Sequence, residues 1–245
     1  MTIKKLKNYI NNERGSGMLI IMVGMLIAAI FIALMFFDFS NVFINKRVTQ
    51  TGADSAALAA AKSSKDTMKE TLQDKTQEEL DALGEAWEQF LEDSADSEPP
   101  AEGEDPPPPP SESELLAEFV EMMEDNYDGR NMPGDMVGWI LDHSVEVKAK
   151  TAMKFFFDDD GVRDIACKSV RDNLTEARKE AEKFAKENQN DKIKQMTFIP
   201  EDFRIYVVTE RKGQYTTVPD EGVPAITAES SARIGEPEGF DIFCD

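Results

Sequence analysis

The stretch MLIIMVGMLIAAIFIALMFF, residues 18–37, decides how this chain is organised, because it contains no charged residue over twenty positions. As an α-helix it is about 30 Å long, which is enough to cross the hydrocarbon core of a bilayer. A buried helix of a soluble protein would seldom be this uniformly apolar over twenty residues. The sequence therefore predicts a single transmembrane helix close to the N-terminus.

Basic residues are concentrated in the segment 1–17 that precedes this span. They are Lys4, Lys5, Lys7 and Arg14, against the one acid Glu13. Basic loops stay on the cytoplasmic side, so we expect residues 1–17 in the cytoplasm and everything from Asp38 outside, in the periplasm or at the cell surface. A cleaved signal peptide is the alternative, although its apolar stretch is usually only about 7–15 residues and no A-x-A site follows Phe37.

The charge and the cysteine count exclude several classes of function. The 245 residues include 48 acidic and 27 basic side chains, for a net charge of −21, which would repel the phosphate backbone of a nucleic acid. Two cysteines and one histidine are too few for a structural zinc site of four Cys or His ligands. We expect no nucleic acid, no metal and no cofactor.

Residues 38–93 contain no proline and are predicted to continue the helix out of the membrane, with a possible break near Gly52 or Gly84. Small residues recur at every fourth position of this segment, in two adjacent stripes. One stripe is Gly52, Ala56 and Ala60, and the other is Ala53, Ala57 and Ala61. Such stripes let another helix approach closely, but an Ala-rich helix without a partner has the same pattern.

An acidic, proline-rich segment separates this helix from the rest of the chain. Nineteen acidic residues and no basic one lie within 78–128, and seven of the twelve prolines lie within 94–114. Residues 94–112 are therefore predicted to be a solvated, extended linker, although a proline run can also be a ligand for SH3 or WW domains. Ser111 and Glu114 form an S-x-x-E capping box, which predicts a new helix start.

Residues 113–245 are predicted to form an α+β domain with a small antiparallel sheet and packed helices. Alternating apolar residues indicate a strand over 145–155, and steps of three and four indicate a helix over 162–186. Further strands are expected in FRIYVVTE from Phe203, in QYTTVP from Gln214, and over 225–234.

The segment 14–62 resembles the N-terminal part of TadE/TadG-like proteins, which accompany the tight-adherence (Tad, or Flp) pilus-assembly machinery. Arg14 and Gly15 lead into the span, Asp38 follows it, and TQTGADSAALAAA at 49–61 is similar to the family pattern Q-x-A-A-D-x-A-A-L-A-A-A. The positions that carry this motif, and that we expect to pack against other helices, are Asp38, Gln50, Gly52, Ala53, Asp54, Ala56, Ala57, Leu58, Ala60 and Ala61.

Two departures from related patterns narrow the subtype. Prepilin-like members have a Glu five residues after the processed glycine, whereas Ile20 and Met22 stand five residues after Gly15 and Gly17. This difference favours a TadG-like protein that keeps its anchor. The D-x-S-x-S metal motif of von Willebrand A domains is absent from the sequence, so no such domain is expected.

No catalytic motif occurs in the chain, and we expect no enzyme activity. His143 could serve a hydrolase only with a distant partner, and a surface or helix-capping role is the simpler interpretation. The acids 158–160 before Gly161 could bind calcium, but their spacing is not that of an EF-hand. They fit better at the N-terminus of a helix, where the helix dipole favours negative charge.

Cys167 and Cys244 both fall in the exported part of the chain, where a pair of thiols is often oxidised. A disulfide between them would tie the C-terminal tail to the helix predicted over 162–186. Two free thiols are the alternative.

Three functions remain to be compared. The resemblance implies a membrane-anchored structural or assembly component of a Tad pilus system, with the membrane and other Tad or pilin-like proteins as partners and no small-molecule substrate. A surface adhesion or sensing module unrelated to pilus assembly is the main alternative. A membrane-tethered hydrolase is the third, and it requires a pocket around His143 with a serine or carboxylate beside it.

Overall fold

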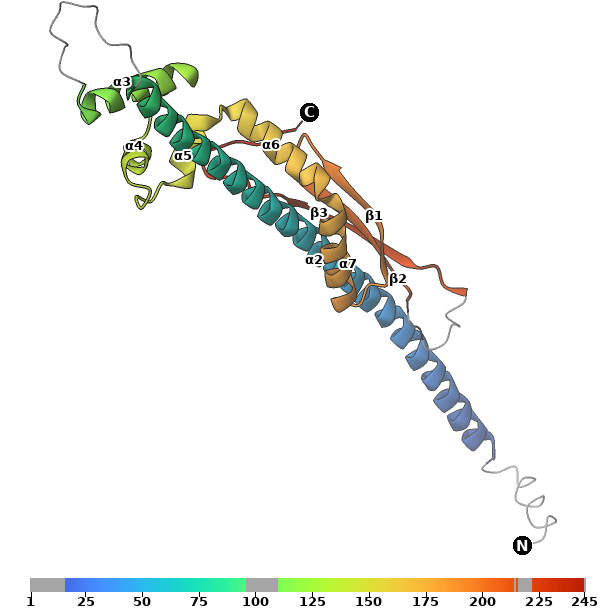
Figure 1. The fold of residues 1–245 in the computed structure, drawn as a ribbon. Helices are drawn as coiled ribbons and strands as arrows, with labels where there is room; N and C mark the ends of the chain where they lie inside the picture. The colour runs from blue at the N-terminus through green and yellow to red at the C-terminus, as the bar shows by residue number, and fades with distance from the viewer. Residues whose placement is uncertain (1–15, 96–109, 214, 216–221, 245) are drawn as a thin grey trace, which may run out of the picture. The chain divides into compact units, whose positions relative to one another are not determined.

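The computed structural model describes residues 16–95, 110–213, 215 and 222–244. Six helices and three strands lie within these residues (Figure 1). They are α2 (Ser16–Ala95), α3 (Glu112–Asn126), α4 (Gly134–Leu141), α5 (Ala149–Phe156), α6 (Asp159–Asp172), α7 (Leu174–Glu187), β1 (Lys192–Ile199), β2 (Arg204–Arg211) and β3 (Ile226–Arg233). Most of the predicted linker, at residues 96–109, lies outside the described part of the chain.

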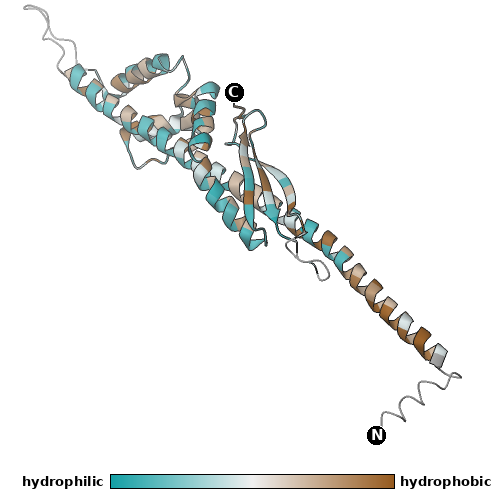
Figure 2. Ribbon diagram, turned by 90° about the vertical axis from the view of Figure 1, so that its right-hand side faces the viewer, coloured by the Kyte–Doolittle hydropathy of each residue, from teal (hydrophilic) through white to brown (hydrophobic). Residues whose placement is uncertain are grey.

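The helix α2 runs without interruption through all 80 residues from Ser16 to Ala95. The breaks considered near Gly52 and Gly84 do not occur, because a single glycine costs a helix only about 1 kcal/mol and the flanking residues are strong helix formers. Figure 2 shows that the N-terminal part of α2 is apolar, whereas the rest of the helix alternates between apolar and polar residues. The apolar span and the motif segment are therefore parts of one helix.

The strand predicted over 145–155 was wrong, because residues 149–156 form the helix α5. The sequence there fits both periods, since apolar residues alternate and also recur in helical steps. Helical geometry buries Ala152, Phe155 and Phe156 together, whereas a strand would place the two adjacent phenylalanines on opposite faces. Burial of both aromatic rings explains why the helix forms.

The single helix predicted over 162–186 is divided into α6 and α7 at Asn173. The Asn173 amide group donates to Thr67 Oγ1 at 2.8 Å, and its backbone N–H bonds to Ser169 O. Asparagine favours such caps over the interior of a helix. The break is thus a consequence of one polar residue in an otherwise periodic pattern.

The three strands form one antiparallel sheet in the order β1-β2-β3. The predictions over 203–210 and 225–234 are confirmed by β2 and β3, and Ile205, Val207 and Thr209 of β2 are alternately buried. The strand β1 was not predicted, and the strand expected from Gln214 falls almost entirely outside the described residues. The predicted α+β class, with a long N-terminal helix, packed helices and a small sheet, is confirmed.

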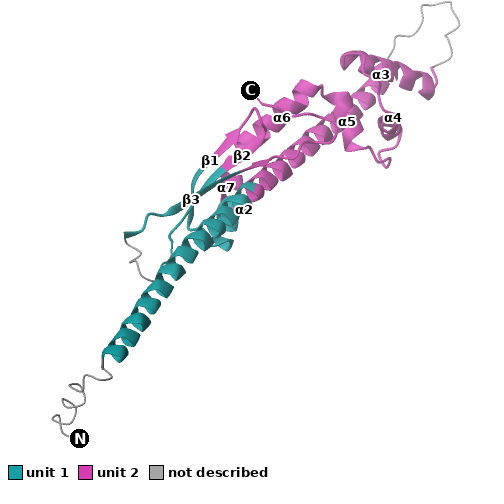
Figure 3. Ribbon diagram, turned by 180° about the vertical axis from the view of Figure 1, so that it is seen from behind, with its two compact units in different colours: residues 1–57, 181–196, 207–230 teal, residues 58–180, 197–206, 231–245 magenta. Residues whose placement is uncertain are grey.

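Two compact units divide the chain, and Figure 3 shows them in different colours. The larger unit comprises residues 58–180, 197–206 and 231–245, and it contains an aromatic core. In that core the Trp87 ring of α2 meets the Phe119 ring of α3 at 5.1 Å between centroids, and Tyr127 meets Phe155 at 4.9 Å. The smaller unit comprises residues 1–57, 181–196 and 207–230.

Candidate functional site on the long helix

The motif residues of α2 fall into a buried set and an exposed set. The small residues are buried, with at most 2% of each alanine exposed. They are Gly52, Ala53, Ala56, Ala57, Ala60 and Ala61. The two stripes are therefore buried within the described part of this chain.

Gly52 lies directly against the buried side chain of Asn190, in the smaller unit. The Asn190 Nδ2 atom donates to the carbonyl oxygen of Thr49 at 3.0 Å and to Thr209 Oγ1 at 2.7 Å. A Cβ atom at position 52 would lie 2.5 Å from Asn190 Cγ, which is an overlap. Glycine at this position therefore permits a hydrogen-bonded connection from α2 to the chain after α7 and to β2.

A second small-residue face lies on α7, which runs beside α2 in Figures 1 and 3. Within the smaller unit, Ala181 and Ala185 are fully buried four residues apart. Small side chains at this spacing allow two helices to approach closely. The sequence contained this signal, because the alanines of α7 have the same spacing as those of the α2 stripes.

The exposed motif residues are Gln50, Asp54 and Leu58, which follow one another at intervals of four residues. The Gln50 Nε2 atom donates to Asp54 Oδ1 at 2.9 Å and to the carbonyl oxygen of Glu229 in β3 at 3.0 Å. Leu58 is 66% exposed, and it stands on the same side of α2 as Asp54. Leu58 is therefore an exposed apolar side chain of the motif, one helical turn from the Asp54 carboxylate.

Asp38, the remaining motif position, is half-buried on α2 directly after the apolar span. Residues Met18–Phe37 are almost all exposed, and α2 is long and apolar enough to cross a membrane by length and composition. This exposure matches a helix surrounded by lipid, because a core helix of a soluble protein is mostly buried.

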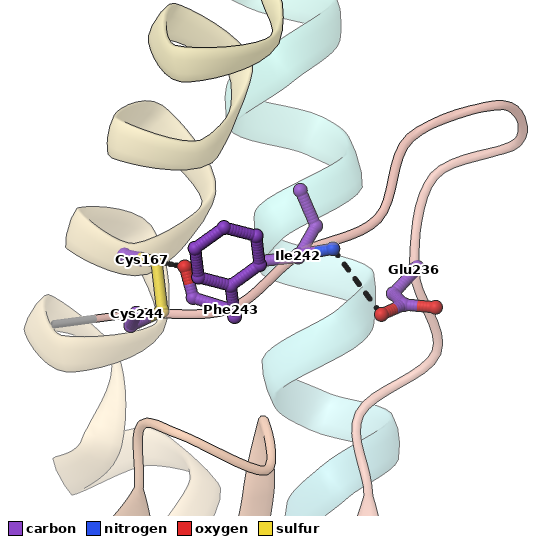
Figure 4. Close-up of a disulfide and its surroundings, with 5 residues drawn as sticks. All are labelled: Cys167, Glu236, Ile242, Phe243 and Cys244. Atoms are coloured by element: carbon purple, nitrogen blue, oxygen red, sulfur yellow. Dashed lines mark hydrogen bonds between the residues drawn. A yellow bond between two sulfur atoms is a disulfide. The ribbon is translucent and has the colours of Figure 1, made fainter.

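The two cysteines form a disulfide between α6 and the C-terminal tail in the larger unit (Figure 4). Further contacts hold the tail in place: the Ile242 N–H donates to Glu236 Oε1 at 3.2 Å, and the Cys244 N–H donates to the Pro200 carbonyl oxygen at 3.2 Å. The Arg163 guanidinium lies 3.8 Å from the Phe243 ring centroid, which is a cation–π contact. The disulfide is thus one of several contacts that hold the C-terminal tail against the larger unit.

His143 is exposed, and its ring meets the Trp139 ring edge-on at 4.4 Å between centroids. It borders an open hollow of about 450 Å³ in the larger unit, together with Asp81, Glu85 and Glu88 of α2. No serine is among the described residues that line this hollow. Carboxylates therefore line the same hollow as His143, as the hydrolase alternative required, whereas the described lining contains no hydroxyl nucleophile for a hydrolase triad.

The acids 158–160 stand at the start of α6, as the helix interpretation predicted. The Asp158 carboxylate accepts a hydrogen bond from the Gly161 N–H at 2.6 Å and caps the helix. Asp159 and Asp160 occupy the first turn, where the helix dipole favours them. Among the described residues there is no group of three His, Cys, Asp or Glu side chains that could hold a metal ion.

Comparison with known families finds a match in the first part of the chain. Residues 15–63 match the family described as putative Flp pilus-assembly TadE/G-like. The segment 15–63 is similar to the TadE/G-like family. This confirms the resemblance found in the sequence, and the matched segment contains both the apolar span and the motif. No curated protein and no solved structure matches the chain.

The TadE/G-like assignment connects the chain with Tad-type pilus assembly. The family is a structural pilus-assembly family and not a family of enzymes. Its segment in this chain is the part of α2 that runs from the apolar span through the Gly52–Asn190 contact.

Proposed function

We propose that this protein is a membrane-anchored, non-catalytic structural or assembly component of a Tad pilus system. The observation that carries the proposal is the TadE/G-like match over residues 15–63, which coincides with an exposed apolar helix long enough to span a bilayer. Residues 18–37 anchor the chain in the cell membrane, residues 1–17 lie in the cytoplasm, and the remainder lies outside. The extracytoplasmic helical segment runs over 38–93, the linker over 94–112 and the α+β domain over 113–245.

The disulfide supports the proposed orientation. Cysteines stay reduced in the cytosol and are oxidised in exported compartments. Cys167 and Cys244 are brought together by the fold, with Cα atoms 5.8 Å apart, which is the usual separation for a disulfide. A C-terminal part on the outer side of the membrane accounts for such a pair.

Contacts with other Tad proteins are made through the exposed side of the motif. The alanine stripes are buried within the chain, so the replacement of Ala56 or Ala60 by leucine would overpack the interior and destabilise the fold. Such a variant would therefore not report on contact with a partner. Leu58 is large, apolar and exposed within the motif, and apolar side chains of this kind contribute to interfaces when a partner covers them.

A photo-crosslinking amino acid at position 58 tests this function in cells that assemble Tad pili. Crosslinks to other Tad proteins are expected at position 58, whereas position 70 serves as the matched control, because Glu70 is an exposed residue of α2 outside the matched segment. Equal crosslinking at both positions, or none at position 58, would contradict the proposed contact. An adjacent secretion ATPase gene and TadB/TadC-like membrane protein genes would distinguish pilus assembly from an adhesion or sensing role.

A further inference from the structure

The exposed apolar surface of α2 does not end at Phe37, where the uncharged stretch ends. Beyond Asp38, four large apolar side chains are 44–63% exposed. They are Phe39, Val42, Phe43 and Ile44. The rings of Phe39 and Phe43 contact each other edge-on, with 5.0 Å between centroids. We refer to residues 39–44 as the collar.

The packed part of the chain begins directly after the collar. Asn45 is 5% exposed and Thr49 is fully buried, and the Thr49 hydroxyl donates to the Asn45 carbonyl oxygen at 2.7 Å. Two exposed cations, Lys46 and Arg47, lie at the same level of the helix. Exposed apolar residues, buried residues and positive charges thus all occur within about three turns of α2.

From this arrangement we propose that the collar lies in the headgroup region of the outer leaflet, so that contact with lipid extends to Ile44. The inference rests on the proposed anchoring of residues 18–37. A helix from Met18 to Phe37 covers the hydrocarbon core of about 30 Å, and residues 38–44 add about 10 Å on the outer side, enough to pass through the headgroup region of one leaflet, which is about 5–8 Å thick. The folded part then begins at the membrane surface, without an intervening stalk.

The composition of the collar fits the headgroup region better than either hydrocarbon or water. Ser40 and Asn41 interrupt the apolar residues, and Asp38 precedes them. Polar groups are costly in hydrocarbon, and four large apolar groups are costly in water. The boundary region accepts both, and aromatic rings collect there. Lys46 and Arg47 stand where lipid phosphates would attract them.

Lipid fits the collar better than a single partner helix does. At 100° per residue, Phe39 and Phe43 lie on one side of α2, and Ile44 lies about 100° further round. One packed helix covers a narrow stripe, whereas lipid surrounds the helix. The collar therefore presents apolar groups over a wider arc than one neighbouring helix would cover.

The depth of the collar can be measured with nitroxide labels on the full-length protein in phosphatidylcholine/phosphatidylglycerol vesicles. A ketone-bearing amino acid carries the label at position 27, 43 or 58, so that the cysteines stay untouched. Accessibility to oxygen and to a water-soluble nickel chelate is then compared. Ile27 reports the middle of the span, Phe43 the collar, and Leu58 the exposed surface of the motif.

The label at position 27 should be open to oxygen and closed to nickel, and the label at 58 should be open to nickel. At position 43 we expect nickel accessibility well below that at 58, with oxygen accessibility between those at 58 and 27. If the label at position 43 has the same oxygen and nickel accessibility as the label at position 58, the proposed depth of the collar is wrong, whereas the proposed anchoring of residues 18–37 still holds. A label at 43 closed to both reagents would show protein contact and would also overturn the proposed depth of the collar. Nickel access at 27 would defeat the anchor itself.

Discussion

Replacement of Gly52 by alanine should destabilise the protein, although alanine is the better helix former. The new Cβ atom would lie 2.5 Å from Asn190 Cγ and 2.8 Å from Asn190 Oδ1, so the whole amide group must move. The bonds from Asn190 Nδ2 to the Thr49 carbonyl and to Thr209 Oγ1 are then lost. Because the site is buried, the Asn190 amide group cannot replace these hydrogen bonds with bonds to water.

The magnitude follows from these contacts. Two hydrogen bonds contribute about 2 kcal/mol, and a buried polar group left without a partner costs about 1–3 kcal/mol more. The higher helix propensity of alanine offsets about 1 kcal/mol of this loss. The expected net loss for Gly52→Ala is about 2–4 kcal/mol, which lowers the melting temperature of a chain of this size by about 4–16 °C. Far-UV circular dichroism of the full-length protein in detergent measures this shift.

A double-mutant cycle provides the control. In an Asn190→Ala background the clash is absent, so Gly52→Ala should be neutral or should stabilise the helix by about 1 kcal/mol. The difference between the two backgrounds is the coupling between these residues. Equal loss of stability in both backgrounds, or no loss from Gly52→Ala alone, would refute the reasoning.

Three further predictions concern the larger unit. Mass spectrometry after alkylation should find no free thiol at Cys167 or Cys244 before reduction. Replacement of both cysteines by alanine should lower the free energy of unfolding, measured in urea, by about 4 kcal/mol, because the disulfide no longer closes a loop of 77 residues in the unfolded chain. Burial, with the charge of Glu79, raises the pKa of Tyr127 to about 12. The free energy of unfolding should therefore not depend on this group below about pH 10 and should fall as the pH rises from about 10 to 12, because the unfolded chain loses the phenolic proton first. The Tyr127→Phe variant should not show this decrease. Ser111→Ala should cost about 1 kcal/mol and speed hydrogen exchange of the first amides of α3, whereas unchanged exchange would show that the capping box contributes nothing.

The sequence pattern predicted the secondary structure correctly where it was compatible with only one kind of element. Residues 18–37, the capping box at Ser111 and the alternation in β2 each favour one structure, and the structure shows a helix, a helix start and a strand there. It failed where two periods coexist, as in 149–156, because the deciding factor was which aromatic side chains reach the core. It also failed at β1, where Lys192 and Lys194 surround Ile193 and only two residues of the strand are buried.

The candidate site could be located from the sequence but not interpreted fully. The spacing of the alanines predicted close helix approach, yet it could not say that this chain itself supplies the covering elements. Asn190 was missed because a single asparagine between a helix and a strand is an ordinary loop residue. Its role arises from a contact 141 residues away in the sequence, with Thr49, which only tertiary structure reveals.

The central claim is that this protein acts in Tad pilus assembly as an anchored, non-catalytic component. The most direct test deletes its gene in a cell that assembles Tad pili and counts surface filaments by electron microscopy. We predict that filaments are lost, that the full-length chain restores them, and that a chain with residues 18–37 replaced by a cleavable signal peptide does not. Normal filament numbers in the deletion strain would contradict the account.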